Sequence, residues 1–283
     1  MADRVAVIGA GQMGNGIAHV CAVAGLDVVM IDVSKEALAK GRAMIEKNLA
    51  RQVQKGSLTE DARGAALGRL KESDSLDAAK NATVVIEAAS ENAALKFKLF
   101  GELDRIAPAD AILATNTSSI SITEIAARTK RPAQVIGMHF MNPVPLMQLV
   151  EVIRGLATSD AVTARVFALS KQLGKTAVEV NDYPGFVSNR VLMPMINEAV
   201  YCLMEGVGTA ESIDTVMKLG MNHPMGPLAL ADLIGLDTCV AILDVLHQGL
   251  GDPKYRACPL LKKYVAAGWL GKKSGRGFFV YGA

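Results

Sequence analysis

The sequence predicts an α/β fold, in which a doubly wound, mostly parallel sheet is followed by a smaller all-α domain. Short β-branched runs alternate with helical segments in the first half of the chain, as in βαβ units. The first of these runs leads into a glycine-rich turn. Beyond Pro184–Gly185 the pattern is helical almost throughout. We therefore expect a first domain at residues 1–183 and a helical domain at residues 184–283.

The composition is that of a globular protein, and it excludes several classes. The 283 residues are 51% hydrophobic and 20% charged, and a net charge of +2 lacks the basic excess of a nucleic-acid-binding protein. No apolar run reaches the roughly 18 residues of a membrane span. The N-terminus leads into a strand with no signal region, so we expect a cytoplasmic protein. The four cysteines form no C-x-x-C pair, so neither a metal site nor a disulfide framework is expected.

The first element is a strand at Val5–Ile8, followed by glycines in G-x-G-x-x-G spacing and then by a helix that ends near Gly25. Gly9 makes the tight turn, Gly11 lets the backbone approach a pyrophosphate, and Gly14 lets the helix pack on the strand. The N–H groups at the start of the helix favour a phosphate. This context predicts a Rossmann-type dinucleotide-binding domain, with a flavin nucleotide as the competing ligand.

The second strand, "VVMID", ends in Asp32, about 20 residues after the glycines. A carboxylate there can accept hydrogen bonds from the ribose hydroxyls of adenosine, and it would repel the additional phosphate of NADP. No arginine follows; the next residues are Val33, Ser34 and Lys35. We therefore predict NAD as the cofactor, while Lys35 keeps NADP open as an alternative.

A long helix is expected over residues 34–55, with Ser34 as its N-cap. Four basic residues lie near one face of it by helical spacing: Lys40, Lys47, Arg51 and Lys55. A solvated face is the usual meaning of such a charge run. The alternative is a basic edge that meets an anionic substrate tail, such as nucleotide phosphates.

Three further strand-like runs follow at residues 82–89, 111–121 and 134–140, with helical segments at 91–106 and 121–129 between them. In parallel sheets of this kind, ligands bind beyond the carboxyl ends of the strands. Ser118, Ser119 and His139 all fall at those ends. We therefore expect these polar side chains where a nicotinamide and its substrate would meet.

His139 stands at the end of an apolar run, and a lone Glu151 follows inside "LVEVI". Buried ionisable groups need partners. If "LVEVI" returns as a strand beside the first run, the two residues can pair, with Pro143 and Pro145 stiffening the turn between them. A histidine with a carboxylate behind its ring is suited to take a hydroxyl proton near neutral pH. The alternative is an ion pair that only orders the turn.

After a last strand, "TAVEV", the chain breaks at Pro184–Gly185, which sets the predicted boundary near 183–185. Residues 185–205 are apolar with little charge, so we expect a helix buried all round, between domains or between subunits. A small helical domain with this much apolar surface suggests a homodimer. Asn189, near the start of this helix, is either an interdomain hydrogen-bonding group or an amide that holds a substrate oxygen.

Motifs along nearly the whole chain resemble the L-3-hydroxyacyl-CoA dehydrogenase family in its short, monofunctional bacterial 3-hydroxybutyryl-CoA form, with no hydratase domain attached. The motifs include "VIGAGQMGNGIA", "EAASEN", "NTSS", "GMHFMNPVPLMQLVEVI", "DYPGFVSNR", "HPMGPLALADLIGLD" and "GWLGKKSGRGFFVY". The resemblance implies an NAD-dependent oxidoreductase that interconverts (S)-3-hydroxybutyryl-CoA and acetoacetyl-CoA. The corresponding expectations are an acyl-CoA substrate and a place in fatty-acid or butanoate metabolism.

The resemblance also implies roles for individual residues. His139 would be the catalytic base and Glu151 its partner, while Ser118 and Asn189 would hold the substrate oxygen. The cofactor-binding positions that it implies are Gly9, Gly11, Gln12, Met13, Gly14, Asp32, Glu91, Lys96, Asn116 and Asn142.

Two rival functions stay open at this point. A related dehydrogenase could act on a free hydroxy acid or sugar acid, which would need a carboxylate clamp such as Arg154 or Arg190. A non-catalytic NAD-binding protein would keep the glycine turn, but it would have no need of the His139–Glu151 pair, Ser118 or Asn189.

Overall fold

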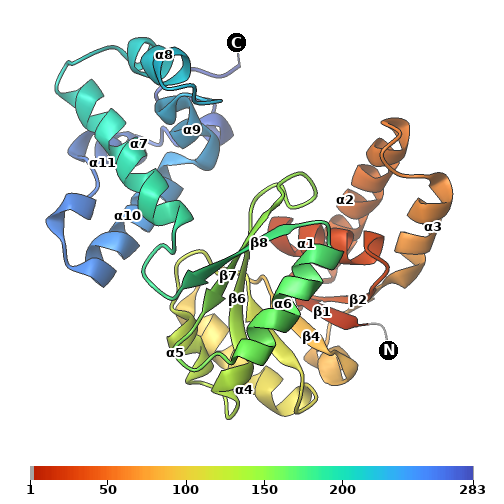
Figure 1. Ribbon diagram of the computed structural model, residues 1–283. Coiled ribbons are helices and arrows are strands. Elements are labelled where there is room, and N and C mark those ends of the chain that lie inside the picture. The colour runs from red at the N-terminus through yellow and green to blue at the C-terminus, as the bar shows by residue number, and fades with distance from the viewer. Residues whose placement is uncertain (1–2, 283) are drawn as a thin grey trace. The chain divides into compact units, whose positions relative to one another are not determined.

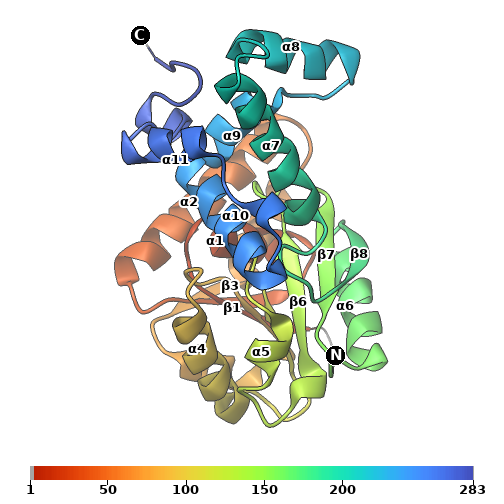
Figure 2. The ribbon, with the colours of Figure 1, turned by 90° about the vertical axis from the view of Figure 1, so that its left-hand side faces the viewer.

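A computed structural model describes residues 3–282 of the chain. The chain divides into two compact units between Asp182 and Tyr183. The first unit holds an eight-stranded sheet covered by helices, and the second unit is built of helices (Figures 1 and 2). The predicted fold class, a mostly parallel Rossmann-type sheet followed by a smaller all-α domain, is confirmed.

The sheet has the strand order β3-β2-β1-β4-β5-β6-β7-β8, and only β6 and β7 are antiparallel neighbours. The chain starts at the centre of the sheet and builds outward in both directions, so the crevice of the doubly wound fold lies between β1 and β4. The strands are β1 (Arg4–Ile8), β2 (Asp27–Ile31), β3 (Leu70–Ser73), β4 (Val84–Glu87), β5 (Ile112–Thr115), β6 (Val135–Phe140), β7 (Leu149–Arg154) and β8 (Thr176–Asn181).

Helices of the first unit cover both faces of this sheet. The helices are α1 (Gln12–Val23), α2 (Lys35–Gln54), α3 (Glu60–Arg69), α4 (Ala93–Ile106), α5 (Ile122–Ala126) and α6 (Asp160–Gln172). Buried side chains of α1, α2, α3 and α6 share one core with Val5 and Val7 of β1. On the opposite face, the site that a Cβ of Gly137 would occupy lies 2.9 Å from Ile122 of α5.

Three elements of this unit are absent from the sequence-based prediction, namely β3, α3 and α6. Only Leu70 of β3 is buried, because β3 is the edge strand of the sheet and pairs with β2 alone. A four-residue edge strand with one buried position shows no alternating pattern from which it could be recognised.

The second unit consists of helices α7 (Ser188–Met204), α8 (Ala210–Gly220), α9 (Pro227–Ile234), α10 (Leu236–Leu250) and α11 (Pro259–Ala266). Its core is formed by residues such as Met193, Leu228, Leu243 and Leu261. The expectation that the first of these helices is buried all round does not hold within one chain, because Val191 of α7 is 67% exposed. Among residues 3–282 no helix combines the length and apolar character of a membrane span.

Candidate functional site

The glycine turn after β1 leaves the start of α1 open. Gly9 has a φ of 101°, and a Cβ on it would lie 2.6 Å from the carbonyl oxygen of Ala88. A Cβ on Gly14 would lie 1.8 Å from the carbonyl oxygen of Gly9, so close packing demands glycine at both positions. Gly11 is the N-cap, its surroundings are empty within 4 Å of a Cβ position, and no side chain caps the helix. The first N–H groups of α1 are therefore available to an anion.

Asp32 follows β2 and lies beside this turn. One carboxylate oxygen accepts a hydrogen bond from the backbone N–H of Ala10 at 2.9 Å, and the other accepts one from Ser34, also at 2.9 Å. Each oxygen of a carboxylate can accept a second bond. Asp32 is half-buried, so it keeps an accessible edge on which ribose hydroxyls could donate.

Residues after β5 and β6 reach back toward the glycine turn. The side-chain amide of Gln12 donates to Asn142 Oδ1 at 3.0 Å, and Asn116 Oδ1 accepts from the backbone N–H of Phe140 at 2.9 Å. Met13 packs half-buried against the core behind the turn. The structure therefore brings together the expected residues that follow β1, β5 and β6.

His139 and Glu151 face each other across the antiparallel pair of β6 and β7, where they are direct partners in the register. His139 Nδ1 lies 2.8 Å from Glu151 Oε2. The two residues are only 8% and 2% exposed, respectively. Because an ionised carboxylate can only accept, Nδ1 carries the hydrogen of this bond and the Nε2 atom keeps its lone pair when the ring is neutral.

The turn between these two strands is tied down by Lys175, which sequence reasoning missed. Its ammonium donates to the carbonyl oxygens of Val144 at 2.5 Å and Met147 at 2.7 Å. Burial lowers the pKa of Lys175. No local pattern marks this lysine, since the carbonyls it binds lie about 30 residues earlier in the chain.

Glu91 gathers the loop that carries Ser118. Its Oε1 atom accepts from the backbone N–H groups of Ser118 at 2.9 Å and Ser119 at 3.1 Å, and from the hydroxyl of Thr117 at 2.6 Å. Burial raises the pKa of Glu91, but the charge of Lys96 and these hydrogen bonds outweigh it, so the pKa lies below its usual value. Glu91 is therefore a carboxylate near neutral pH.

Lys96 is buried, with a 1% exposed side chain, and its ammonium lies 2.7 Å from Glu87 Oε1 and 3.5 Å from Glu91 Oε2. Glu87 and its neighbour Thr115, joined by a 2.7 Å hydrogen bond, are site residues that sequence reasoning missed. The signal in the sequence was a lone acid that ends the apolar run "VVIE", nine residues before a lysine.

Asn189 belongs to the second unit, where it is the second residue of α7. Its side chain is buried at 9% exposure, and its backbone N–H donates to the carbonyl of Gly185 at 3.2 Å. Of the two arginines considered for a carboxylate clamp, Arg154 is engaged elsewhere, because its guanidinium lies 2.6 Å from Asp160 and 3.5 Å from Glu179.

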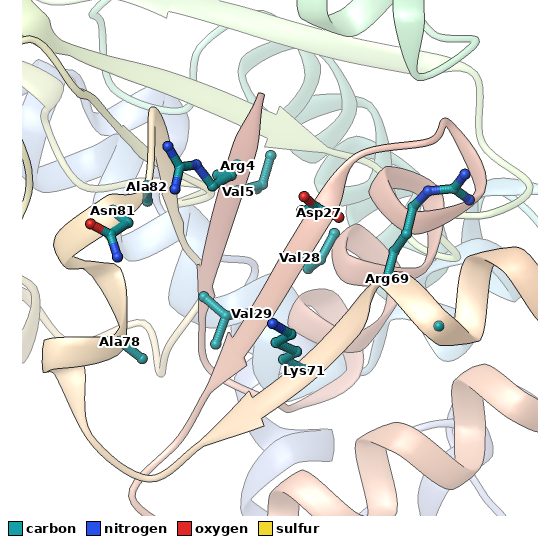
Figure 3. A pocket seen from close by; sticks show the side chains of 11 residues that line it. Arg4, Val5, Asp27, Val28, Val29, Arg69, Lys71, Ala78, Asn81 and Ala82 are labelled. Carbon is teal, nitrogen blue, oxygen red and sulfur yellow. The ribbon is translucent and has the colours of Figure 1, made fainter. Parts of the chain in front are cut away.

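Two cavities of the first unit differ in where they lie relative to these groups. One of about 280 Å³ is seen in Figure 3, and Arg4, Asp27 and Lys71 around it stand at the amino ends of β1, β2 and β3. That edge is opposite to the carboxyl ends where the site residues gather. A second cavity, of about 450 Å³, is lined by residues that include His19, Gln52 and Lys175. Of the four basic residues on one face of α2, Lys40 pairs with Glu36 at 2.7 Å, as on a solvated face.

Comparison with known proteins identifies the family. The model of the NAD-binding domain of 3-hydroxyacyl-CoA dehydrogenase matches residues 4–183, and the model of the C-terminal domain matches residues 185–281. The chain is 63% identical to a probable 3-hydroxybutyryl-CoA dehydrogenase of Bacillus subtilis, with 98% of this chain and 97% of the relative covered. It is 40% identical to the mitochondrial hydroxyacyl-coenzyme A dehydrogenase of Sus scrofa, with 99% and 92% covered.

A solved structure gives the same result. The crystal structure of an (S)-3-hydroxybutyryl-CoA dehydrogenase from Ralstonia eutropha matches with a TM-score of 0.97 at 54% identity, and both chains are covered in full. Sequence and fold therefore agree along the entire chain. This chain belongs to the 3-hydroxyacyl-CoA dehydrogenase family and is an oxidoreductase whose cofactor is NAD.

Proposed function

We propose that this chain interconverts (S)-3-hydroxybutyryl-CoA and acetoacetyl-CoA, with His139 as the general base and Glu151 as its partner. Two of the relatives are named for this substrate. The observation that carries the assignment of the base is the 2.8 Å contact between His139 Nδ1 and Glu151 Oε2 at the carboxyl end of β6. Oxidation of a secondary alcohol requires a base with such geometry.

His139 takes the proton of the 3-hydroxyl group on Nε2, because Nδ1 is directed at Glu151. The imidazolium that forms is stabilised by the carboxylate behind it. Glu151 is 2% exposed, so water screens this interaction little. In the reverse direction His139 returns the proton to the oxygen of the ketone.

Ser118 donates a hydrogen bond to the 3-oxygen, where negative charge gathers as the ketone is reduced. The backbone N–H of Ser118 anchors the loop on Glu91 at 2.9 Å, whereas its hydroxyl lies 3.2 Å from the same oxygen. The substrate oxygen can replace the longer of these two contacts without releasing the loop. We assign Asn189 of the second unit as a second hydrogen-bond donor to the same substrate oxygen.

The residues around the glycine turn fit NAD. The space at Gly11 is empty within 4 Å of a Cβ position, and the uncapped start of α1 offers N–H donors to a pyrophosphate. Asp32 accepts from the ribose hydroxyls and disfavours an additional phosphate, while Gln12 holds Asn142 at the nicotinamide end. NAD, held by these residues, would supply the acceptor for the hydride that leaves the carbon bearing the hydroxyl group.

The test is the initial rate of NADH oxidation with acetoacetyl-CoA, for the wild type and for His139→Asn. We expect turnover by the wild type and a loss of roughly 10²–10⁴-fold in kcat for the variant, with little change in NADH affinity. His247→Asn, at a half-buried histidine of α10, is the matched control and should keep wild-type rates. NADPH and free acetoacetate are tried in parallel and should be poor substrates.

Turnover of free acetoacetate as fast as that of the thioester would reject the acyl-CoA assignment. Wild-type rates in His139→Asn would show that His139 is not the general base, but would not affect the assignment of the acyl-CoA substrate. If NADH binds but neither substrate reacts, the chain has another substrate.

A further inference from the structure

Glu87, the last residue of β4, is a fully buried carboxylate at the centre of the first unit, with 0% exposure. We propose that Glu87 is a positioning residue that holds both the glycine turn and the Ser118 loop in place. The part of this inference that concerns Ser118 rests on the proposed function, whereas the part that concerns the glycine turn does not. We refer to four residues together as the Glu87 cluster, namely Glu87, Thr115, Lys96 and Glu91.

Each carboxylate oxygen of Glu87 accepts two hydrogen bonds. Oε1 accepts from Lys96 Nζ at 2.7 Å and from the backbone N–H of Ala89 at 2.7 Å. Oε2 accepts from Lys96 Nζ at 2.9 Å and from the hydroxyl of Thr115 at 2.7 Å. A buried carboxylate that accepts four hydrogen bonds from three donor groups has one orientation available, so it can fix the groups around it.

One arm of the cluster reaches the glycine turn. The bond from Ala89 to Glu87 holds the segment just after β4, in which Ala88 donates to Ile8 at 2.7 Å. This segment packs directly on the turn, since a Cβ on Gly9 would meet the carbonyl of Ala88 at 2.6 Å. A shift of Ala88 would therefore move the backbone that is proposed to bind the pyrophosphate.

The other arm reaches the Ser118 loop by two routes. Thr115 Oγ1, which donates to Glu87, accepts from the backbone N–H of Thr117 at 3.3 Å. Lys96, held by Glu87, lies 3.5 Å from Glu91 Oε2, and the other oxygen of Glu91 binds Ser118 at 2.9 Å. The lowered pKa of Glu91 agrees with a lysine kept beside it.

Stability alone does not account for a buried ion pair, because well-packed apolar residues are often as stable at such positions. The ion pair of Asp104 and Arg131, 2.8 Å apart, offers a comparison in the same unit, with side chains only 8% and 15% exposed. Asp104 lies in α4 and Arg131 precedes β6, so this pair stands at the edge of the sheet opposite to the site. It makes a matched control.

The experiment compares Glu87→Gln with Asp104→Asn in NADH binding, by fluorescence titration, and in kcat with acetoacetyl-CoA. Glu87→Gln should weaken NADH binding about tenfold and lower kcat by about 10–100-fold, since small misplacements at a site are costly. Asp104→Asn should lower the thermal midpoint yet leave both quantities within about twofold.

A double-mutant cycle with Ser118→Ala separates positioning from general damage. If Glu87 acts through Ser118, its effect on kcat should shrink several-fold in the Ser118→Ala background, whereas that of Asp104→Asn should be unchanged. If Glu87→Gln does not fold, Thr115→Val should show the same pattern in weaker form, and Thr115→Ser should restore the wild-type values.

Wild-type NADH affinity and kcat in folded Glu87→Gln would overturn the inference, as would an effect on kcat that is fully additive with Ser118→Ala. If the wild type does not reduce acetoacetyl-CoA, the proposed function fails by itself. The NADH titration then still tests the arm of the cluster that reaches the glycine turn.

Discussion

At the scale of single residues, buried ionisable side chains of the first unit are held in two pairs. His139 faces Glu151 at 2.8 Å, and Lys96 faces Glu87 at 2.7 Å. An isolated charge would be costly in these surroundings. Glu91 lies nearer to water, with 39% of its side chain exposed, and takes its hydrogen bonds from the Ser118 loop. Its ionisation is therefore coupled to the order of that loop.

The lowered pKa of Glu91 predicts a pH dependence of stability. The folded pKa of Glu91 lies below the ordinary value of about 4.5, which it has in the unfolded chain. The contribution of Glu91 is therefore fully present above the unfolded value and is lost as pH falls through the folded pKa. The stability difference between wild type and Glu91→Gln should be constant from pH 7 to about 5.5 and should narrow below about 4.5.

Urea unfolding of both proteins at a series of pH values checks this. All other carboxylates are common to the two chains and cancel in the difference. A difference that stays the same down to pH 3.5 would contradict the assignment.

At the scale of elements, the junction of β1 and α1 separates two kinds of glycine. Gly14 packs against Gly9 so closely that a methyl group has no room, with a Cβ position 1.8 Å from the carbonyl oxygen. Gly11 has a φ of −62°, which any residue can adopt, and open space around it. The fold therefore requires glycine at position 14, whereas at position 11 the proposed need for glycine is to let a bound cofactor approach the backbone.

The substitutions Gly11→Ala and Gly14→Ala should consequently behave differently. Gly14→Ala should destabilise the first unit by about 3 kcal/mol, because the backbone must shift to admit the methyl group. Gly11→Ala should leave the thermal midpoint nearly unchanged and weaken NADH binding about tenfold, or ~1.4 kcal/mol. Thermal melts and NADH titrations of both variants test this difference between the two glycines. Unchanged NADH affinity in Gly11→Ala would mean that the pyrophosphate binds elsewhere.

At the scale of the whole molecule, the second unit exposes apolar side chains on and after α8. Val216 and Met221 are each 60% exposed and Leu219 is 80% exposed. Clustered apolar exposure of this kind marks a surface that associates. The homodimer expected from the sequence stays a prediction, and α8 is the surface on which we expect it to form.

Sedimentation velocity tests this expectation. The wild type should sediment as a dimer, and Leu219→Lys should shift it toward monomer, because a charge would be buried in the contact. Leu156→Lys, at a 91% exposed leucine of the first unit, should leave the dimer intact. A monomeric wild type would refute the dimer, and a dimeric Leu219→Lys variant would move the interface away from α8.

The sequence by itself determined those features whose physical causes lie close together in the chain. The glycine spacing with Asp32 depends on one βαβ unit, and the pairing of His139 with Glu151 depends on two strands joined by a short turn. The motifs were also sufficient to indicate the family. Each of these features depends on a short segment of the chain, so it can be predicted without knowing which other elements pack against that segment.

Only the tertiary structure decided which distant residues support the site. Glu87 meets Thr115, 28 residues later, because β4 and β5 are neighbours in the sheet. Lys175 ties down a turn about 30 residues earlier, and Glu91 collects Thr117, Ser118 and Ser119 from the next βα junction. Local sequence patterns cannot specify such contacts, because strand order and the packing of side chains between elements bring these groups together.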